Sequence, residues 1–126
     1  LIVHAGDIGK SEVLDRLQAI APVAAIKGNN DTAPWADHIP EILDVHVKDR
    51  TLRVIHNVRD SESNLRVAGI DVVISGHSHK PSVESRDNVL FINPGSAGPR
   101  RFKLPVTVGL LLLEDADPYA EIIHLL

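Results

Sequence analysis

Two histidines two residues apart, His77 and His79, directly follow an apolar run at residues 70–75. Such a run favours a buried strand, and Gly76 allows the chain to turn at its end without a steric clash. Two imidazoles that leave one strand end side by side can ligate a metal ion. The pattern alone leaves open that they are ordinary loop histidines, one packed and one in solvent.

Three further apolar runs also end in residues that bind metals. They are Asp7 after residues 1–5, Asn29 after residues 23–26 and His56 after residues 51–55. In open α/β sheets, ligands bind in the crevice outside the carboxyl ends of the strands. One carboxylate, one amide oxygen and three imidazoles at such an edge suit Mn, Fe, Co, Ni or Zn better than calcium, which prefers oxygen ligands alone.

The elements that position these ends follow from hydrophobic periodicity. We expect a helix that begins at Lys10 or Ser11, with Ser11 as its N-cap, and continues with helical spacing to Ala21 before Pro22. A short helix over residues 62–68 is a weaker expectation. Alternation predicts hairpins at residues 42–47 with 51–55 and 83–85 with 89–92, and a closing pair at 106–114 with 120–125. Residues 1–126 therefore form a single, strand-rich α/β domain.

Composition excludes several kinds of protein. The 126 residues include no cysteine, which rules out disulfides, thiolate catalysis and cysteine-ligated metals, and which fits a cytoplasmic location. No apolar run has the roughly 20 residues of a membrane helix. A net charge of −4 makes a nucleic-acid surface unlikely, because such surfaces cluster Lys and Arg. The chain starts inside an apolar run and contains no Met, so we expect that residues upstream of Leu1 are missing.

The motifs, in order, are Gly6-Asp7, Gly28-Asn29-Asn30-Asp31, His56, Gly76-His77-Ser78-His79 and Asn93-Pro94-Gly95-Ser96. This set resembles the calcineurin-like metallophosphoesterases, in particular their small bacterial and archaeal phosphodiesterase branch, which also resembles the retromer scaffold subunit. The resemblance covers residues 6–96 and implies an αββα sandwich with a two-metal centre. The family's first motif, D-x-H, would lie on a strand before Leu1, which implies that the fold is truncated at its N-terminus.

The resemblance implies a role for each matching residue in catalysis and metal binding. Asp7 would bridge two metals, Asn29, His56 and His77 would bind the second, and His79 would bind the first. The pair would hold a bridging hydroxide and polarise the phosphoryl oxygens of the substrate. Manganese is the expected metal, with Fe, Ni, Co and Zn as alternatives. With only two protein ligands, the first site would be weak unless an upstream segment completes it.

The expected substrate is a small phosphodiester or phosphomonoester. Asn30 lies where some relatives have a histidine that can act as general acid. Because an amide cannot transfer a proton at neutral pH, this change favours esters with good leaving groups. Ser96 and Arg100 are candidate substrate contacts, although the basic run at residues 100–103 is equally compatible with an ordinary solvated turn.

Two other interpretations remain open at this point. The chain could be a non-catalytic module that binds a protein through the same fold, or an inactive fragment. The presence of His56, His77 and His79 at their motif positions favours the enzyme, because a scaffold could lose them freely. The sequence is compatible with an oligomer and gives no further information on one.

Overall fold

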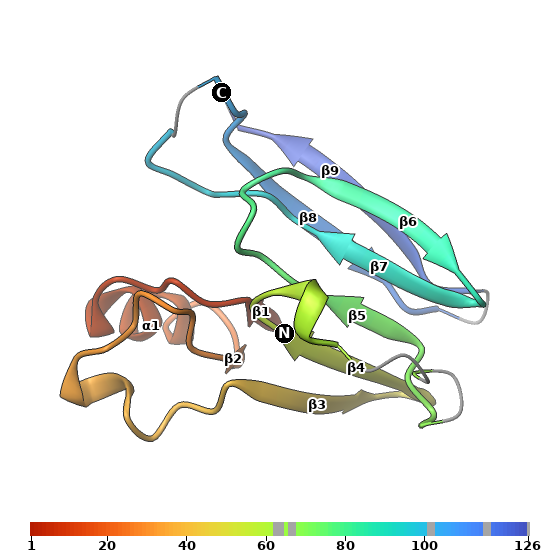
Figure 1. The fold of residues 1–126 in the computed structure, drawn as a ribbon, viewed down its shortest axis with the longest axis horizontal. Coiled ribbons are helices and arrows are strands. Elements are labelled where there is room, and N and C mark those ends of the chain that lie inside the picture. Colours follow the sequence, from red (N-terminus) through yellow and green to blue (C-terminus); the bar gives the residue numbers. More distant parts are fainter. Residues whose placement is uncertain (62–64, 66–67, 101–102, 115–116, 126) are drawn as a thin grey trace.

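The computed structural model describes residues 1–61, 65, 68–100, 103–114 and 117–125. Within these ranges the chain forms one α-helix, two short 3₁₀-helices and nine strands (Figure 1). Their order is β1 (Ile2–His4), α1 (Ser11–Gln18), β2 (Val23–Ala25), η1 (Pro34–Ala36), β3 (Ile42–Val47), β4 (Arg50–Ile55), η2 (Val58–Asp60), β5 (Val72–Ile74), β6 (Ser82–Arg86), β7 (Val89–Asn93), β8 (Thr107–Leu112) and β9 (Tyr119–His124).

The largest sheet has five strands in the order β3-β4-β5-β7-β6. Its three central strands, β4, β5 and β7, are parallel, and each outer strand joins its neighbour in an antiparallel hairpin. The β6–β7 turn has positive φ at both Asp87 and Asn88, as the two-residue turn that matches strand twist requires. Three parallel strands therefore end at the same edge of the sheet.

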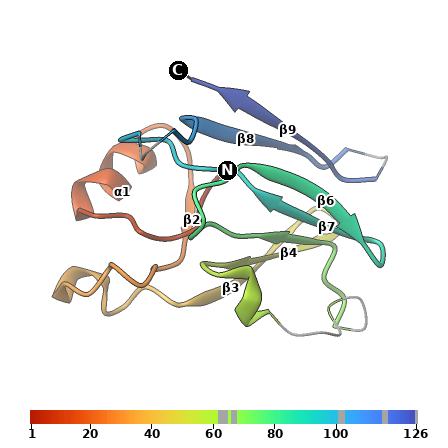
Figure 2. The same cartoon turned by 45° about the horizontal axis from the view of Figure 1, so that its top comes forward.

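Two strand pairs pack on one face of this sheet, the parallel pair β1–β2 and the antiparallel pair β8–β9. Val3 of β1 and Leu111 of β8 both contact a cluster of buried aliphatic side chains from the central strands, which include Val72 and Ile74. Figure 2 shows β8 and β9 as a separate layer beside β6 and β7. Because side chains alternate along a strand, Val73 points the other way, into a second cluster with Ile55. The sandwich core is thus built on both faces of β5.

The expected α/β fold with two strand layers is confirmed, and so are the two hairpins and the closing pair. The expected start of the helix at Lys10 or Ser11 is confirmed, but its expected N-cap and its expected end were wrong. Lys10 is the N-cap, Ser11 is the first helical residue, and α1 ends at Gln18 rather than near Pro22. The physical reason for the early end is that Pro22 disfavours helix in the residue before it, while its carbonyl accepts the backbone N–H of Ile2. The segment after Gln18 therefore turns early to begin the β1–β2 ladder.

The helix expected over residues 62–68 falls largely outside the described residues. In the part of the chain that is described, no helix is both long and apolar enough to cross a membrane.

Candidate metal centre

The polar residues that follow β1, β2, β4 and β5 meet at one edge of the sandwich. The Asp7 carboxylate lies beside the His56 ring, with Oδ2 and Nε2 3.3 Å apart. His77 Nδ1 lies 3.3 Å from the same His56 Nε2, and Asp7 Oδ1 accepts the backbone N–H of Asn30 at 3.1 Å. Parallel strands with a common direction bring residues far apart in sequence to this one place.

His56 is the central side chain of the cluster. Its Nδ1 lies 2.7 Å from the carbonyl oxygen of Ala5, which can only accept a hydrogen bond. Nδ1 therefore carries the proton, and in a neutral ring Nε2 is left with a lone pair. A backbone carbonyl that fixes the tautomer in this way is the usual partner of a histidine that ligates a metal.

The lone pair of His56 Nε2 then faces a second acceptor, the Asp7 carboxylate. Two acceptors 3.3 Å apart repel each other unless a proton or a cation lies between them. Donor atoms about 2.1 Å from one metal ion lie roughly 3.0–3.4 Å from one another, which is the spacing seen around Nε2. The donor set and its spacing thus fit a divalent transition metal.

The turn after β5 holds two of its residues in left-handed conformations. His77 and His79 have φ of 65° and 62°, a region that costs energy for residues with side chains. The turn is fixed because Gly76 N–H donates to the His56 carbonyl at 2.9 Å, and because the Asn93 amide donates to the Gly76 carbonyl at 2.8 Å. His79 Nδ1 is buried without a hydrogen-bond partner, as expected for an atom that awaits a ligand.

Asp31 organises the opposite side of the centre. Its carboxylate accepts the backbone N–H groups of Ile8 at 3.0 Å, Gly9 at 3.1 Å and Gly28 at 2.8 Å. Burial by itself would raise the pKa of Asp31, but these amide donors and that of Asp7 lower it below its ordinary value. Asp31 thereby ties the turn after β1 to the turn after β2.

Glycine at position 28 is required by this close approach. A Cβ on Gly28 would collide with the backbone and carboxylate of Asp7, which lies directly above it. Gly6 is similarly confined, since its φ is +97° and a Cβ there would lie 2.6 Å from His56 Nδ1. The two glycines thus allow the turns after β1, β2 and β4 to come into contact.

His4 supports the centre from inside β1. Its Nδ1 accepts the N–H of Gly6 at 3.2 Å. Burial lowers the pKa of His4, although the nearby carboxylates of Asp31 and Asp7 act in the opposite direction. His4 is therefore a neutral, supporting side chain at neutral pH.

Among the described residues, the side chains of the other predicted site residues form no hydrogen bond with the cluster. Asn29 is exposed at the tip of the turn after β2. The Ser96 hydroxyl accepts the N–H of Gly98 at 3.3 Å, and exposed Arg100 donates from Nε to the carbonyl of Leu104 at 3.3 Å. Both contacts stay within their own loop, so the roles proposed for Asn29, Ser96 and Arg100 stay predictions.

Across the described ranges, no group of three or more His, Cys, Asp or Glu side chains is placed so that it could hold a metal ion without rearrangement. Binding therefore requires some rotation of the candidate ligands. Sequence reasoning placed Asn93 in a motif but gave it no role; its amide donates to the Gly76 carbonyl and to the Ser78 hydroxyl at 3.1 Å. The same reasoning missed Thr107, which donates to the Pro94 carbonyl at 2.7 Å. The signal for both was a polar residue beside a strongly apolar run.

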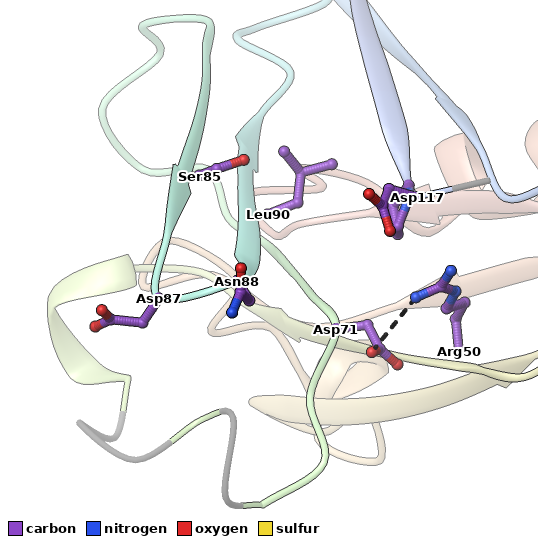
Figure 3. Close-up of a pocket in the computed structure, with 8 residues that line it drawn as sticks. Arg50, Asp71, Ser85, Asp87, Asn88, Leu90 and Asp117 are labelled. Carbon is purple, nitrogen blue, oxygen red and sulfur yellow. Dashed lines mark ion pairs between the residues drawn. The ribbon is translucent and has the colours of Figure 1, made fainter.

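A cavity of about 520 Å³ lies at the other end of the central strands, away from this cluster (Figure 3). It is bordered by Arg50 at the start of β4, Asp71 before β5 and Asp87 in the β6–β7 turn. Arg50 and Asp71 form an ion pair of 3.9 Å across it. Asp71 also accepts the N–H of Thr51 at 2.8 Å, so these side chains support the sheet.

Comparison with known proteins agrees with this architecture. A probable metallophosphoesterase of Methanocaldococcus jannaschii is 36% identical over 104 residues, which are 76% of this chain and 52% of the relative. The chain thus spans about half the length of that relative. A probable metallophosphoesterase of Methanothermobacter thermautotrophicus is 32% identical over 131 residues, which are 98% of this chain and 75% of the relative.

Solved structures share the fold. Vps29 of Chaetomium thermophilum superposes with a TM-score of 0.75 at 16% identity and covers 98% of this chain and 78% of its own. An archaeal phosphodiesterase superposes with a TM-score of 0.75 at 25% identity, covering 96% of this chain and 81% of its own. Residues 1–116 match the calcineurin-like phosphoesterase superfamily domain. The chain therefore belongs to the calcineurin-like phosphoesterase superfamily.

Proposed function

We propose that this protein is a metal-dependent phosphoesterase that hydrolyses small phosphodiesters. The observation that carries the proposal is the environment of His56. Its Nδ1 is bound to the Ala5 carbonyl, and its Nε2 faces both Asp7 and His77 at 3.3 Å. A neutral His56 ring and an ionised Asp7 repel each other in this arrangement, and a metal ion bound between them would replace that repulsion with attraction.

The chain's own residues would act as follows. Asp7, His56 and His77 would provide the central ligands, and His79 and Asn29 would turn toward the ions from either side. The Asn30 N–H holds Oδ1 of Asp7 and so directs Oδ2 toward His56. When bound, divalent metal ions would polarise the phosphoryl oxygens and lower the pKa of a water molecule. A chain without cysteine fits hydrolysis by water rather than by a thiolate nucleophile.

Leaving-group chemistry limits the substrates. The backbone N–H of Asn30 donates to the Asp7 carboxylate, and the family resemblance implies that its side chain stands where some relatives have a proton donor for the departing alcohol. An amide cannot supply that proton at neutral pH, so turnover should be fastest with acidic alcohols such as aryl groups. Manganese is the metal that we propose first; Zn²⁺ is present in a solved structure of Vps29 from Entamoeba histolytica.

The test is hydrolysis of bis-p-nitrophenyl phosphate by the full chain with Mn²⁺ or with EDTA, together with Mn²⁺ titration by calorimetry. We expect turnover only with Mn²⁺. His77→Ala should lower turnover by more than about 100-fold, since even the loss of a residue that only orients a metal ligand costs about 10- to 100-fold. His38→Ala, an exposed histidine outside the cluster, is the matched control. Turnover that survives both EDTA and His77→Ala would contradict the proposal.

A second candidate is a non-catalytic module that binds another protein. The observation that favours it is the outer face of β8–β9, where Leu110, Leu112, Tyr119 and Ile123 are 46%, 40%, 57% and 40% exposed. Apolar groups in such number on one face are unusual for a free surface. Tight Mn²⁺ binding without turnover of any phosphodiester would favour this candidate over the enzyme.

A further inference from the structure

A cavity of about 490 Å³ opens on the outer face of the five-stranded sheet, directly beside the candidate metal centre. One end is formed by Gly76, His77 and Ser78 of the turn after β5. Its sides are η2 and strand β6, and its base includes Val58 and Phe91. A group bound in the cavity would therefore lie next to a phosphorus atom held at His77.

The charged residues around this cavity are mainly cationic. Arg59, Lys80 and Arg86 border it together with one carboxylate, Glu84. Arg86 is already engaged, since its Nε lies 3.6 Å from Glu84 and its guanidinium stacks 4.1 Å from the centre of the Phe91 ring. This local excess of positive charge occurs in a chain whose net charge is −4.

Arg59 and Lys80 are the two cations that remain. Both are exposed, and neither forms an ion pair with a carboxylate in the described part of the chain. A nearby side chain fixes the backbone of each residue. The Arg59 N–H donates to the side-chain oxygen Oδ1 of Asn57 at 3.1 Å, and the Lys80 N–H donates to the Ser78 hydroxyl at 3.2 Å. Arg59 follows His56 by three residues, and Lys80 follows His77 by three residues. The segments that carry the candidate metal ligands His56 and His77 therefore also place two cations, Arg59 and Lys80, at the same cavity.

A simple phosphodiester has one negative charge, which the metal centre would neutralise. Two unpaired cations beside that centre suit a second anion, because charge-assisted hydrogen bonds from Arg and Lys to phosphate are among the strongest available. The apolar base of Val58 and Phe91 suits the organic part that links the two anions. Arg100, the cation predicted from the sequence, instead bonds within its own loop.

We propose that this cavity binds a second anionic group of the substrate, so that the preferred substrate is a phosphodiester with a further phosphate on one of its two alcohols. This inference rests on the proposed function, because it places the hydrolysed diester at His77. Arg59 and Lys80 are then the residues that determine specificity.

Two chromogenic substrates test the kinetic consequence. The p-nitrophenyl ester of thymidine 5′-phosphate is compared with the same compound carrying a 3′-phosphate, in Mn²⁺ at low ionic strength. We expect the 3′-phosphate to raise kcat/KM by at least about fivefold, and Arg59→Gln or Lys80→Gln each to reduce that ratio by about three- to fivefold, as expected for partly exposed charge pairs. Arg16→Gln removes the same charge from an exposed position on α1 and should leave the ratio within about twofold, since long-range effects are screened.

A binding measurement without metal separates this inference from the proposed function. In EDTA, thymidine 3′,5′-bisphosphate should bind at least about fivefold more tightly than thymidine 5′-phosphate by calorimetry, and Lys80→Gln should remove the difference. That result supports the cavity even if no substrate is hydrolysed, in which case only the proposed function fails. Mn²⁺-dependent hydrolysis with equal kcat/KM for both substrates would overturn the cavity proposal alone. Equal binding of the two nucleotides in EDTA, or a preference that Lys80→Gln and Arg16→Gln reduce alike, would also overturn it.

Discussion

At the scale of single residues, the candidate centre depends on carboxylates and imidazoles whose protonation the backbone determines. The Ala5 carbonyl fixes the proton of His56 on Nδ1, and backbone amides keep the Asp31 carboxylate ionised. Both effects act through main-chain groups that no residue motif contains. They explain why the two side chains are buried although one is polar and the other charged.

Asp31→Asn should destabilise the fold by about 2 kcal/mol at neutral pH, because the neutral amide accepts backbone N–H groups less strongly than the carboxylate does. Since the folded pKa of Asp31 lies below its ordinary value, the carboxylate stabilises the protein above about pH 4 and loses this effect as pH falls through the folded pKa. Urea unfolding of both proteins in EDTA measures the difference. It should be constant from pH 8 to about pH 5 and shrink in stronger acid; a difference that grows in acid would contradict this account.

Gly28→Ala should destroy metal binding, because the new Cβ would displace Asp7. Overlap with backbone atoms cannot be relieved by rotating a side chain, so we expect a loss of more than about 2 kcal/mol of unfolding free energy as well. Gly69→Ala is the control for added volume, since a Cβ there would meet nothing within 4 Å; its positive φ, which Gly28 does not have, adds backbone strain but no collision. Calorimetric Mn²⁺ titration and urea unfolding check both variants, and retained Mn²⁺ affinity in Gly28→Ala would refute the steric argument.

At the scale of elements, the ends of β5 and β7 are joined by one side chain. Asn93 is the last residue of β7. Its side-chain amide donates to the Gly76 carbonyl and to the Ser78 hydroxyl, and its side-chain oxygen Oδ1 accepts the N–H of Gly95. The turn that carries His77 is therefore held in place by a neighbouring strand.

Asn93→Ala should destabilise the protein by about 1–3 kcal/mol, since it leaves buried polar groups without partners. It should also weaken Mn²⁺ binding by about 10-fold, because the His77 turn loses its support. Asn93→Asp keeps the acceptor for Gly95 and loses both donors, so it should recover part of the stability and none of the affinity. Thermal unfolding and Mn²⁺ titration separate these effects, and full affinity in Asn93→Ala would show that the turn does not need this support.

The same scale shows what a sequence can predict. Alternation located the hairpins at β3–β4 and β6–β7 because one period governs both burial and pairing. The position of Asp7, His56 and His77 at strand ends predicted that they lie together, since parallel strands share an edge, and the structure brings them together. Their binding of a metal stays a prediction. The end of α1 was not predictable from its periodicity, because the amides of Ala19 and Ala21 still bond back to Asp15 and Leu17 while the chain leaves the helix before Pro22. The partners of Asn93 and the pairing of Arg86 with Glu84 depend on tertiary contacts, and no local pattern contains them.

At the scale of the whole molecule, two layers of strands bring three turns into contact, and the centre should therefore report on global stability. In the absence of metal, a neutral His56 ring places the lone pair of Nε2 3.3 Å from the Asp7 carboxylate, and only a proton, such as one donated by His77 Nδ1, can relieve their repulsion. Mn²⁺ would bind between the two acceptors and remove their repulsion. Because only the folded chain brings these ligands together, its binding free energy would stabilise the native state. The metal should thus act as a stabiliser of the complete sandwich, not only of its edge.

Mn²⁺ at about 100 times its Kd should stabilise the native state by about 2.7 kcal/mol, which corresponds to a rise in Tm of roughly 10 °C for a chain of this size. Asp7→Asn should abolish this rise and leave the Tm in EDTA unchanged or slightly higher, because the amide N–H can donate to His56 Nε2. Scanning calorimetry with Mn²⁺ and with EDTA measures both effects. If Asp7→Asn keeps the rise, the stabilising ion binds elsewhere, and the centre at the ends of β1, β4 and β5 is not the metal site.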